Sequence, residues 1–370
     1  MNALYSIGSN GSGQLGIGHK EDVSVPKPVI FHPHQQPTCP VTRVSAGGNH
    51  TLLLTASGEL YWSGDPSTGA CGLGKSLNLP VFQKVILSVG EDSKRDRITL
   101  VAATWEASVI VTESRQDQDG AEQQRKQAVY TFGVGLKGEL GAGELIVRTP
   151  SATRLADFPP QGTEVVDLHA CMGHVVAVLS SGDAYAWGNC RKGQAGARHS
   201  GVLHAPQRIE GVGFPVRRAV CCKDATCLFG EPDGGQLLVL GGSDKWTLQS
   251  AAPRSVPAWT DVGASWGSIY VLTREGRLLA WGRDDHGQLP PPDLPPLRSM
   301  AVGSEHVVAL SRDGDVLSWG WGEHGNCGPN VQDNDVKGRW NVIASSKFIP
   351  DGSSIALLFF FFLFFPFYLS

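Results

Sequence analysis

Short apolar runs recur along the whole chain, and each gives way to a polar turn that ends in glycine. Runs such as "TLLLT" at 51–55, "VVAVL" at 175–179 and "VVAL" at 307–310 have the length of a β-strand. Long stretches with apolar residues three and four positions apart, which mark amphipathic helices, are missing between these runs. The pattern therefore predicts an all-β protein and excludes folds that alternate strands with helices.

A glycine template, Gly-x4-Gly-x2-Gly, alternates with these runs. It is preceded by an apolar or aromatic residue in most copies, so each copy is interpreted as a strand entering a tight turn. A sixth copy has Pro290 in its last place, and a seventh is degraded around Gly241 and Gly242. The first glycines of the six recognisable copies, which we expect to have a structural role, are Gly8, Gly64, Gly133, Gly188, Gly282 and Gly320.

The distance between successive copies predicts the architecture. The first glycines lie about 38 to 69 residues apart, enough for roughly four short strands in each unit. Seven units of this kind predict a seven-bladed β-propeller. The first copy begins close to the N-terminus with no preceding half, so we expect a C-terminal segment, over 353–358, to complete that blade. Such closure removes the open sheet edges that favour aggregation.

The domain boundaries follow from this arrangement. Residues 1–358 are predicted to form a single propeller, with a proline-rich connector at 289–297. The segment 113–127, "ESRQDQDGAEQQRKQ", is polar and free of aromatic residues, and it predicts a solvated loop inserted in the third blade.

The last residues, 359–370, form an apolar tail. The run "IALLFFFFLFFPFYL" has 15 residues, fewer than the roughly 20 that span a bilayer, and Pro366 interrupts it. Phe, Leu, Pro and Ser all have codons built only of pyrimidines, so we interpret the tail as a translated polypyrimidine tract and a gene-model artefact. The alternative is a membrane tail anchor. Sequencing of the mature message across residue 358 is expected to lack these codons, and a message that retains them would overturn the interpretation.

Composition and charge limit the possible functions. The 370 residues are 41% hydrophobic, enough for a packed core, and their net charge of −4 argues against direct nucleic-acid binding. The N-terminal residues lack a basic and an apolar segment, so no secretory signal is expected, and the eight cysteines are expected to be free thiols. No four-ligand spacing or nucleophile elbow occurs. The sequence therefore predicts no metal, no cofactor and no enzymatic activity.

The two templates together resemble the repeat of the regulator of chromosome condensation (RCC1-like) family, a seven-bladed propeller. The resemblance covers about residues 4–345. Within that family, Tyr5–Pro26, Trp319–Pro329, "GGNHT" at 47–51, "TWEASVIV" at 104–111 and "GSEH" at 303–306 resemble the fungal alpha-tubulin suppressor proteins. The fifth blade, around Gly241, and the C-terminus depart from the pattern.

This resemblance implies a non-enzymatic partner protein. It implies docking of a small CSL-type zinc-finger protein, and through that protein a link to diphthamide synthesis on elongation factor 2 and to Elongator-dependent modification of wobble uridines in tRNA. We expect a monomer or heterodimer in the cytoplasm and nucleus, with no membrane contact unless the tail is native. By analogy with the wider family, the alternative function is a guanine-nucleotide exchange factor for a small GTPase.

Candidate contact residues follow from variation within the repeat. Equivalent positions of a propeller form a ring on one face. His50, His174 and His306 share one slot eight residues before a glycine, which predicts hydrogen bonds between neighbouring blades. Because exposed aromatic residues anchor many interfaces, residues that vary from blade to blade are the candidates for partner contact. The predicted contact residues are Trp105, Glu106, Trp266, Glu305, His306, Trp321, Glu323 and His324; for the last three the alternative is packing on a neighbouring blade.

Overall fold

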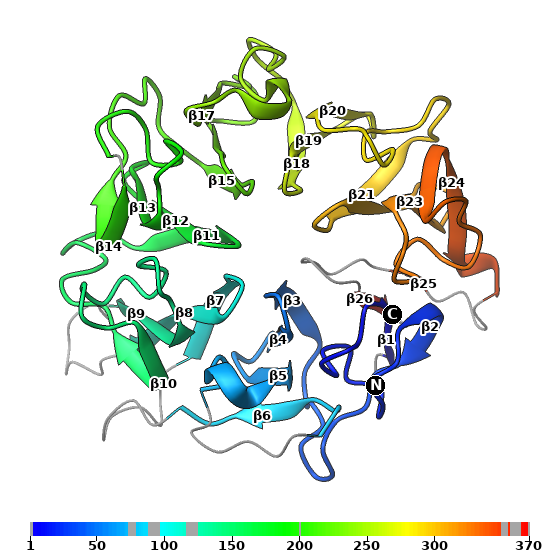
Figure 1. Cartoon of the computed structure of the whole chain (residues 1–370), viewed down its shortest axis with the longest axis horizontal. Helices are drawn as coiled ribbons and strands as arrows, with labels where there is room; N and C mark the ends of the chain where they lie inside the picture. The colour runs from blue at the N-terminus through cyan, green and yellow to red at the C-terminus, as the bar shows by residue number, and fades with distance from the viewer. Residues whose placement is uncertain are drawn as a thin grey trace.

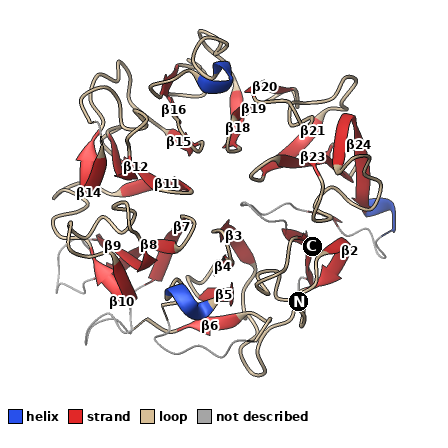
Figure 2. Cartoon of the chain, viewed as in Figure 1, coloured by secondary structure: helices blue, strands red, loops and turns tan. Residues whose placement is uncertain are grey.

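The computed structural model shows a ring of seven antiparallel sheets around a central axis (Figure 1). Each sheet has three or four strands, and the short 3-10 helices lie in the connecting loops (Figure 2). The prediction of an all-β, seven-bladed propeller is confirmed. The structure describes residues 3–72, 79–87, 97–115, 125–199, 201–348, 354–355 and 364–368.

In six blades the strands follow one another in chain order from the axis outward. Figure 1 shows the first strand of each of these blades nearest the centre. The first strands are β3 (Val41–Ala46), β7 (Arg97–Ala103), β11 (Val165–Cys171), β15 (Arg218–Cys221), β18 (Trp259–Ala264) and β21 (Leu297–Val302). The second strands are β4 (His50–Thr55), β8 (Ala107–Arg115), β12 (His174–Leu179), β16 (Thr226–Phe229), β19 (Ser268–Thr273) and β22 (His306–Ser311). The third strands are β5 (Leu60–Gly64), β9 (Arg125–Val134), β13 (Ala184–Asn189), β17 (Leu237–Leu240), β20 (Leu278–Gly282) and β23 (Asp315–Trp321). Fourth strands are β6 (Gln83–Val85), β10 (Arg148–Arg154), β14 (Val202–Arg208) and β24 (Asp335–Ser345).

The remaining blade, blade 1, is built from both ends of the chain in the order β2-β1-β26-β25. Strand β1 (Ala3–Gly8) pairs with β2 (Val23–Pro28) and with β26 (Phe364–Tyr368), whereas β25 (Ser354–Ile355) pairs only with β26. The segment expected to close the blade, 353–358, therefore contributes β25, which lies one strand away from β1. The strand that pairs with β1 is β26, from the apolar tail. The reason is that β1 ends at a third-strand glycine, so two strands have to complete the blade on its inner side.

The predicted loop at 113–127 is shorter than expected. Strands β8 and β9 continue pairing to the Arg115–Arg125 position, so 113–115 and 125–127 belong to the hairpin. Residues 116–124 lie outside the described part of the chain. Antiparallel pairing is made by backbone groups, which polar side chains do not prevent, and this is why the polar composition predicted too long a loop.

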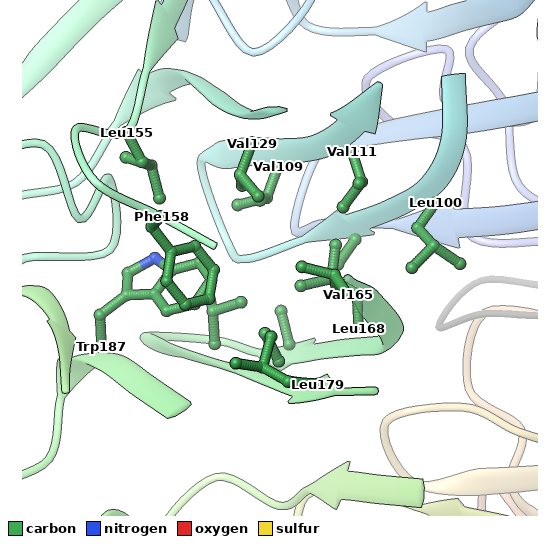
Figure 3. Close-up of a cluster of buried hydrophobic side chains, with 14 residues drawn as sticks. Leu100, Val109, Val111, Val129, Leu155, Phe158, Val165, Leu168, Leu179 and Trp187 are labelled. Carbon is green, nitrogen blue, oxygen red and sulfur yellow. The ribbon is translucent and has the colours of Figure 1, made fainter. Parts of the chain in front are cut away.

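The core lies between the blades rather than within them. The described residues form seven apolar clusters, one at each contact between neighbouring blades. Figure 3 shows the cluster between blades 3 and 4, where Val109 and Val129 of one blade face Leu168 and Trp187 of the next. The strands are apolar on both faces because each face is buried against a neighbour.

The first glycine of the repeat lets the third strand approach the turn between the first two strands. At Gly133, φ is 112° and an added Cβ would lie 2.3 Å from the carbonyl oxygen of Glu106. That oxygen accepts a hydrogen bond of 2.9 Å from the backbone N–H of Val134. Any side chain would break this contact. The same close approach recurs at Gly64, Gly188, Gly282 and Gly320.

Two of the repeated histidines connect neighbouring blades. His50 Nε2 lies 3.0 Å from Ser108 Oγ, which donates to Ala70 O, so the imidazole is the donor. His174 Nε2 lies 3.0 Å from Thr226 Oγ1. The partners are side-chain hydroxyls of the next blade rather than its backbone. Burial lowers the pKa of both imidazoles to about 4, so they are neutral at pH 7.

We expect Gly133→Ala to destabilise the protein more than Gly143→Ala. Both glycines have nearly the same φ, 112° and 110°, but an added Cβ at Gly143 meets nothing within 4 Å. Urea denaturation is expected to show a loss of about 1–2 kcal/mol for Gly143→Ala and of about 3 kcal/mol or more for Gly133→Ala. Equal losses would show that the close approach to Glu106 does not constrain this position.

Stability is also expected to fall as the pH drops from about 6.5 towards 4. The buried histidines have lowered pKa values in the fold, so the unfolded chain binds more protons over this range and protonation favours unfolding. Urea unfolding of His174→Gln at several pH values should give a shallower dependence, by up to about 1.4 kcal/mol per pH unit. The exposed His19→Gln is the control; an unchanged slope for His174→Gln would contradict the assignment.

Candidate functional site

The turns between the first and second strands lie together at one end of the blades. We call this the inner-hairpin face; it comprises residues 47–49, 104–106, 172–173, 222–225, 265–267 and 303–305. Backbone hydrogen bonds connect turns of neighbouring blades. Trp105 N donates to Met172 O at 2.8 Å, and Trp266 N donates to Ser304 O at 2.9 Å. The side chains on this face are therefore carried by turns of fixed position.

Two tryptophans meet at the centre of this face. The ring centroids of Trp105, from blade 3, and Trp266, from blade 6, are 6.1 Å apart and tilted by 46°. Trp105 is 39% exposed, and its ring lies over Gly48, where an added Cβ would come within 2.5 Å of the indole. The glycine provides the space for the ring. The structure thus brings together two sequence-predicted contact residues that lie 161 positions apart.

A cavity of about 230 Å³, the Trp246 cavity, lies on one side of the pair. Trp246 is 39% exposed and stands in a loop where it, Asp244 and Thr247 all have positive φ. Such strain in residues other than glycine is concentrated at functional sites. The Arg283 guanidinium lies 5.1 Å from the centroid of the Trp246 ring. This loop replaces the glycine turn where the repeat is degraded, and blade 5 has only three strands there.

A second cavity of about 300 Å³, the Trp105 cavity, borders Trp105 and is lined by residues of blades 3, 4 and 5. Glu106, one of the predicted contact residues, lines it together with Leu136, which is 71% exposed. Burial raises the pKa of the Glu139 carboxyl, which also lines the cavity. Lys223 and Asp224 of blade 5 border both cavities, so the two are adjacent, with Trp266 in the wall of the first and Trp105 in the wall of the second.

Glu305 and His306, expected at the contact surface, are instead buried, at 1% and 2% exposure. The Glu305 carboxylate pairs with Arg283, and its other oxygen accepts a 2.8 Å hydrogen bond from Gln288 Nε2. Burial raises the pKa of Glu305 and lowers that of His306 to about 4. Glu305, the last residue of its inner turn, holds Arg283 and also lines the Trp246 cavity, whereas His306, in the same slot as His50 and His174, is packed inside the fold.

Trp321 is the last residue of β23. Glu323 and His324 follow it in the outer turn of blade 7, the turn between its third and fourth strands. Trp321 stacks on His286 of blade 6, with centroids 5.5 Å apart, and His324 Nδ1 lies 2.9 Å from Asp22 Oδ2 of blade 1. Of the two interpretations of these residues, packing on a neighbouring blade describes Trp321, whereas the His324 side chain contacts blade 1 but remains 44% exposed. Glu323 is exposed.

Several residues that line the two cavities were not predicted from the sequence. No common motif marks these residues, which come from loops of blades 3 to 6, with two of them in one turn of blade 3: Trp246, Arg283, Met172, Leu136 and Glu139. The one available signal was at Trp246, a large aromatic residue in a polar segment where the repeat breaks down.

Metal and thiol chemistry have little support in the described ranges. Within them, no group of three or more His, Cys, Asp or Glu side chains is placed to hold a metal ion. All eight cysteines are free, and burial raises the pKa of the Cys171, Cys221, Cys222 and Cys227 thiols. Among the described residues, no helix has the length and apolar character needed to span a membrane.

Glu305→Ala is expected to destabilise the fold because it leaves the half-buried Arg283 and the buried Gln288 without the carboxylate. Chemical denaturation should show a loss of about 1–3 kcal/mol in the free energy of unfolding. The matched control, Glu275→Ala in the exposed turn between β19 and β20, should change it by less than about 0.5 kcal/mol. If the two variants were equally stable, the Glu305 carboxylate would contribute nothing to holding Arg283.

Comparison with known proteins agrees with this geometry. The regulator of chromosome condensation (RCC1) repeat matches residues 2–54, and a second form of that repeat matches 41–70, 259–288 and 298–326. The fold is similar to human WBSCR16, with a TM-score of 0.76 and 17% identity over the whole of both chains. It is also similar to Prp20p of Saccharomyces cerevisiae, with a TM-score of 0.76 and 20% identity over 100% of this chain and 92% of that one.

Among curated proteins, the mouse secretion-regulating guanine nucleotide exchange factor is 27% identical over 311 residues, which cover 77% of this chain and 61% of that protein. An RCC1 repeat-containing protein of Schizosaccharomyces pombe is 30% identical over 321 residues, covering 82% of this chain and 83% of the relative. The repeat, the seven-bladed ring and this relative together show that the chain belongs to the RCC1 repeat family.

Proposed function

We propose that this protein is a protein-binding propeller and that its inner-hairpin face is the docking surface. The observation that carries the proposal is the meeting of Trp105 and Trp266 at the centre of that face, between two cavities. Tryptophan buries a large apolar area at little conformational cost, and residues near the centre of an interface dominate binding energy. The backbone bonds between turns hold both rings in place before a partner arrives, which lowers the entropy cost of binding.

The partner we propose is a small CSL-type zinc-finger protein, through which the propeller would support diphthamide synthesis and Elongator-dependent tRNA modification. This choice rests on the resemblance of the first and last blades and of the "TWEASVIV" segment to the fungal alpha-tubulin suppressor proteins. That segment contains Trp105 and Glu106, so the same residues carry the resemblance and lie on the proposed face.

Calorimetry between the full chain and the CSL zinc-finger protein from the same organism tests the pairing. We expect one-to-one binding with submicromolar affinity. A folded propeller that shows no heat of binding would overturn the choice of partner.

Trp105→Ala should weaken that binding by about thirtyfold, the effect of removing an interface anchor worth about 2 kcal/mol. Leu145→Ala, at a 93% exposed apolar position on the outer loop of blade 3, is the control and should leave the affinity unchanged. Circular dichroism of both variants checks the fold. Equal affinities for the two variants would place the interface on another surface.

A second candidate is guanine-nucleotide exchange on a small GTPase. It is favoured by the 27% identity to the mouse secretion-regulating guanine nucleotide exchange factor. The fold is also similar to that of Prp20p, a protein that binds Gsp1p. A nucleotide-release assay with GTPases from the same organism decides it. Accelerated release by the wild-type chain would favour exchange activity over the scaffold.

A further inference from the structure

The Trp105 cavity combines an indole with three carboxylates. Glu106 comes from the inner turn of blade 3, Glu139 from its outer turn, and Asp224 from the inner turn of blade 5. Within the described ranges, none of the three belongs to a salt bridge. The pKa of Glu139 is raised by burial and, to a smaller extent, by the negative charge of Glu106. Glu106 and Glu139 therefore repel one another in a partly desolvated site.

The two lysines at the rim offset only part of this charge, because three carboxylates and two ammonium groups line the cavity. The Lys223 ammonium lies 5.8 Å from the Trp266 centroid and is drawn towards that ring. Lys137 is exposed; its backbone N–H donates to Glu139 Oε2 at 2.6 Å, and its positive charge lowers the pKa of Glu139 against the larger effect of burial. The cavity thus has a surplus of acceptors.

An unused acceptor lies in the same wall. Asn189 Oδ1 is buried and has no hydrogen-bond partner. An added Cβ at Gly173 would lie 3.3 Å from Asn189 Cβ and 3.6 Å from Glu139 Oε1, so these two residues border one gap. The amide atom of Asn189 nearest this gap is Nδ2, 3.8 Å from the same Cβ position, whereas Oδ1 is enclosed by protein.

We propose that the Trp105 cavity binds an arginine side chain of the partner protein; this rests on the proposed docking function of the inner-hairpin face. A guanidinium stacks on an indole and presents five N–H donors in one plane, enough to reach carboxylates from different turns. An acidic anchor is disfavoured by the three carboxylates. A purely apolar anchor would bury them without a counter-charge. Lysine carries the same charge but neither stacks as a plane nor spans as many acceptors.

The test uses the full chain labelled with 5-fluorotryptophan and observed by ¹⁹F NMR, with the Trp105 signal assigned from Trp105→Phe. The probes are the capped tripeptides acetyl-Gly-Arg-Gly-amide, acetyl-Gly-Lys-Gly-amide and acetyl-Gly-Gln-Gly-amide. We expect the arginine peptide to shift the Trp105 signal saturably and more tightly than the lysine peptide, and the glutamine peptide to produce no saturable shift. Glu139→Gln and Glu106→Gln should each weaken arginine binding at least threefold, whereas the exposed control Glu275→Gln should not.

Equal responses to the arginine and glutamine peptides, or unchanged binding in both glutamate variants, would overturn the proposal. The outcome is separable from that of the proposed function. A chain that binds the arginine peptide at Trp105 but not the CSL protein would keep the cavity assignment and lose the partner. A chain that binds the CSL protein through Trp105, yet ignores the arginine peptide, would keep the docking face and lose the arginine pocket.

Discussion

The burial of each blade against its two neighbours is the interaction on which the rest of this structure depends. A blade of three or four short strands has two apolar faces and no core of its own, and the seven clusters lie at the seven contacts between blades. A ring with one blade missing would expose two such faces. This explains why both ends of the chain contribute strands to blade 1, whose contacts with blades 2 and 7 involve Leu4 and Ile7.

Once the ring is closed, the repeated glycines determine how firmly the inner turns of the blades are held. The third strand reaches the inner turn only because Gly64, Gly133, Gly188, Gly282 and Gly320 have no side chain. The inner turns are then held from two directions, by their own third strand and by the next blade. Their backbone is fixed, and the side chains that they carry are free to differ. A rigid frame with variable turns is the arrangement in which binding residues are commonly found.

The inner-hairpin face shows what that freedom allows. Blades 3 and 6 contribute the tryptophans Trp105 and Trp266, whose rings meet over the axis. The buried carboxylate of Glu305, from blade 7, holds Arg283 in an ion pair. Where blade 5 has lost its glycine turn, a strained loop presents Trp246 instead. The features that depart from the repeat are thus concentrated on one face. The two cavities differ in net charge, because the Trp246 cavity is lined by three cationic and three anionic side chains, whereas three carboxylates and two lysines line the Trp105 cavity.

The sequence by itself determined the strands, the blade number and closure through the chain ends, because these follow from local periodicity and from glycines that only a tight turn requires. It also indicated Trp105, Trp266 and Glu106 as unlike their counterparts in other blades. Only the tertiary structure decided that Glu305 and His306 point inward, that Trp321 stacks on His286, and that the strand beside β1 is Phe364–Tyr368. The reason is physical: a repeat fixes the backbone slot of each residue, whereas exposure and partners depend on side chains from other blades, which local sequence does not contain.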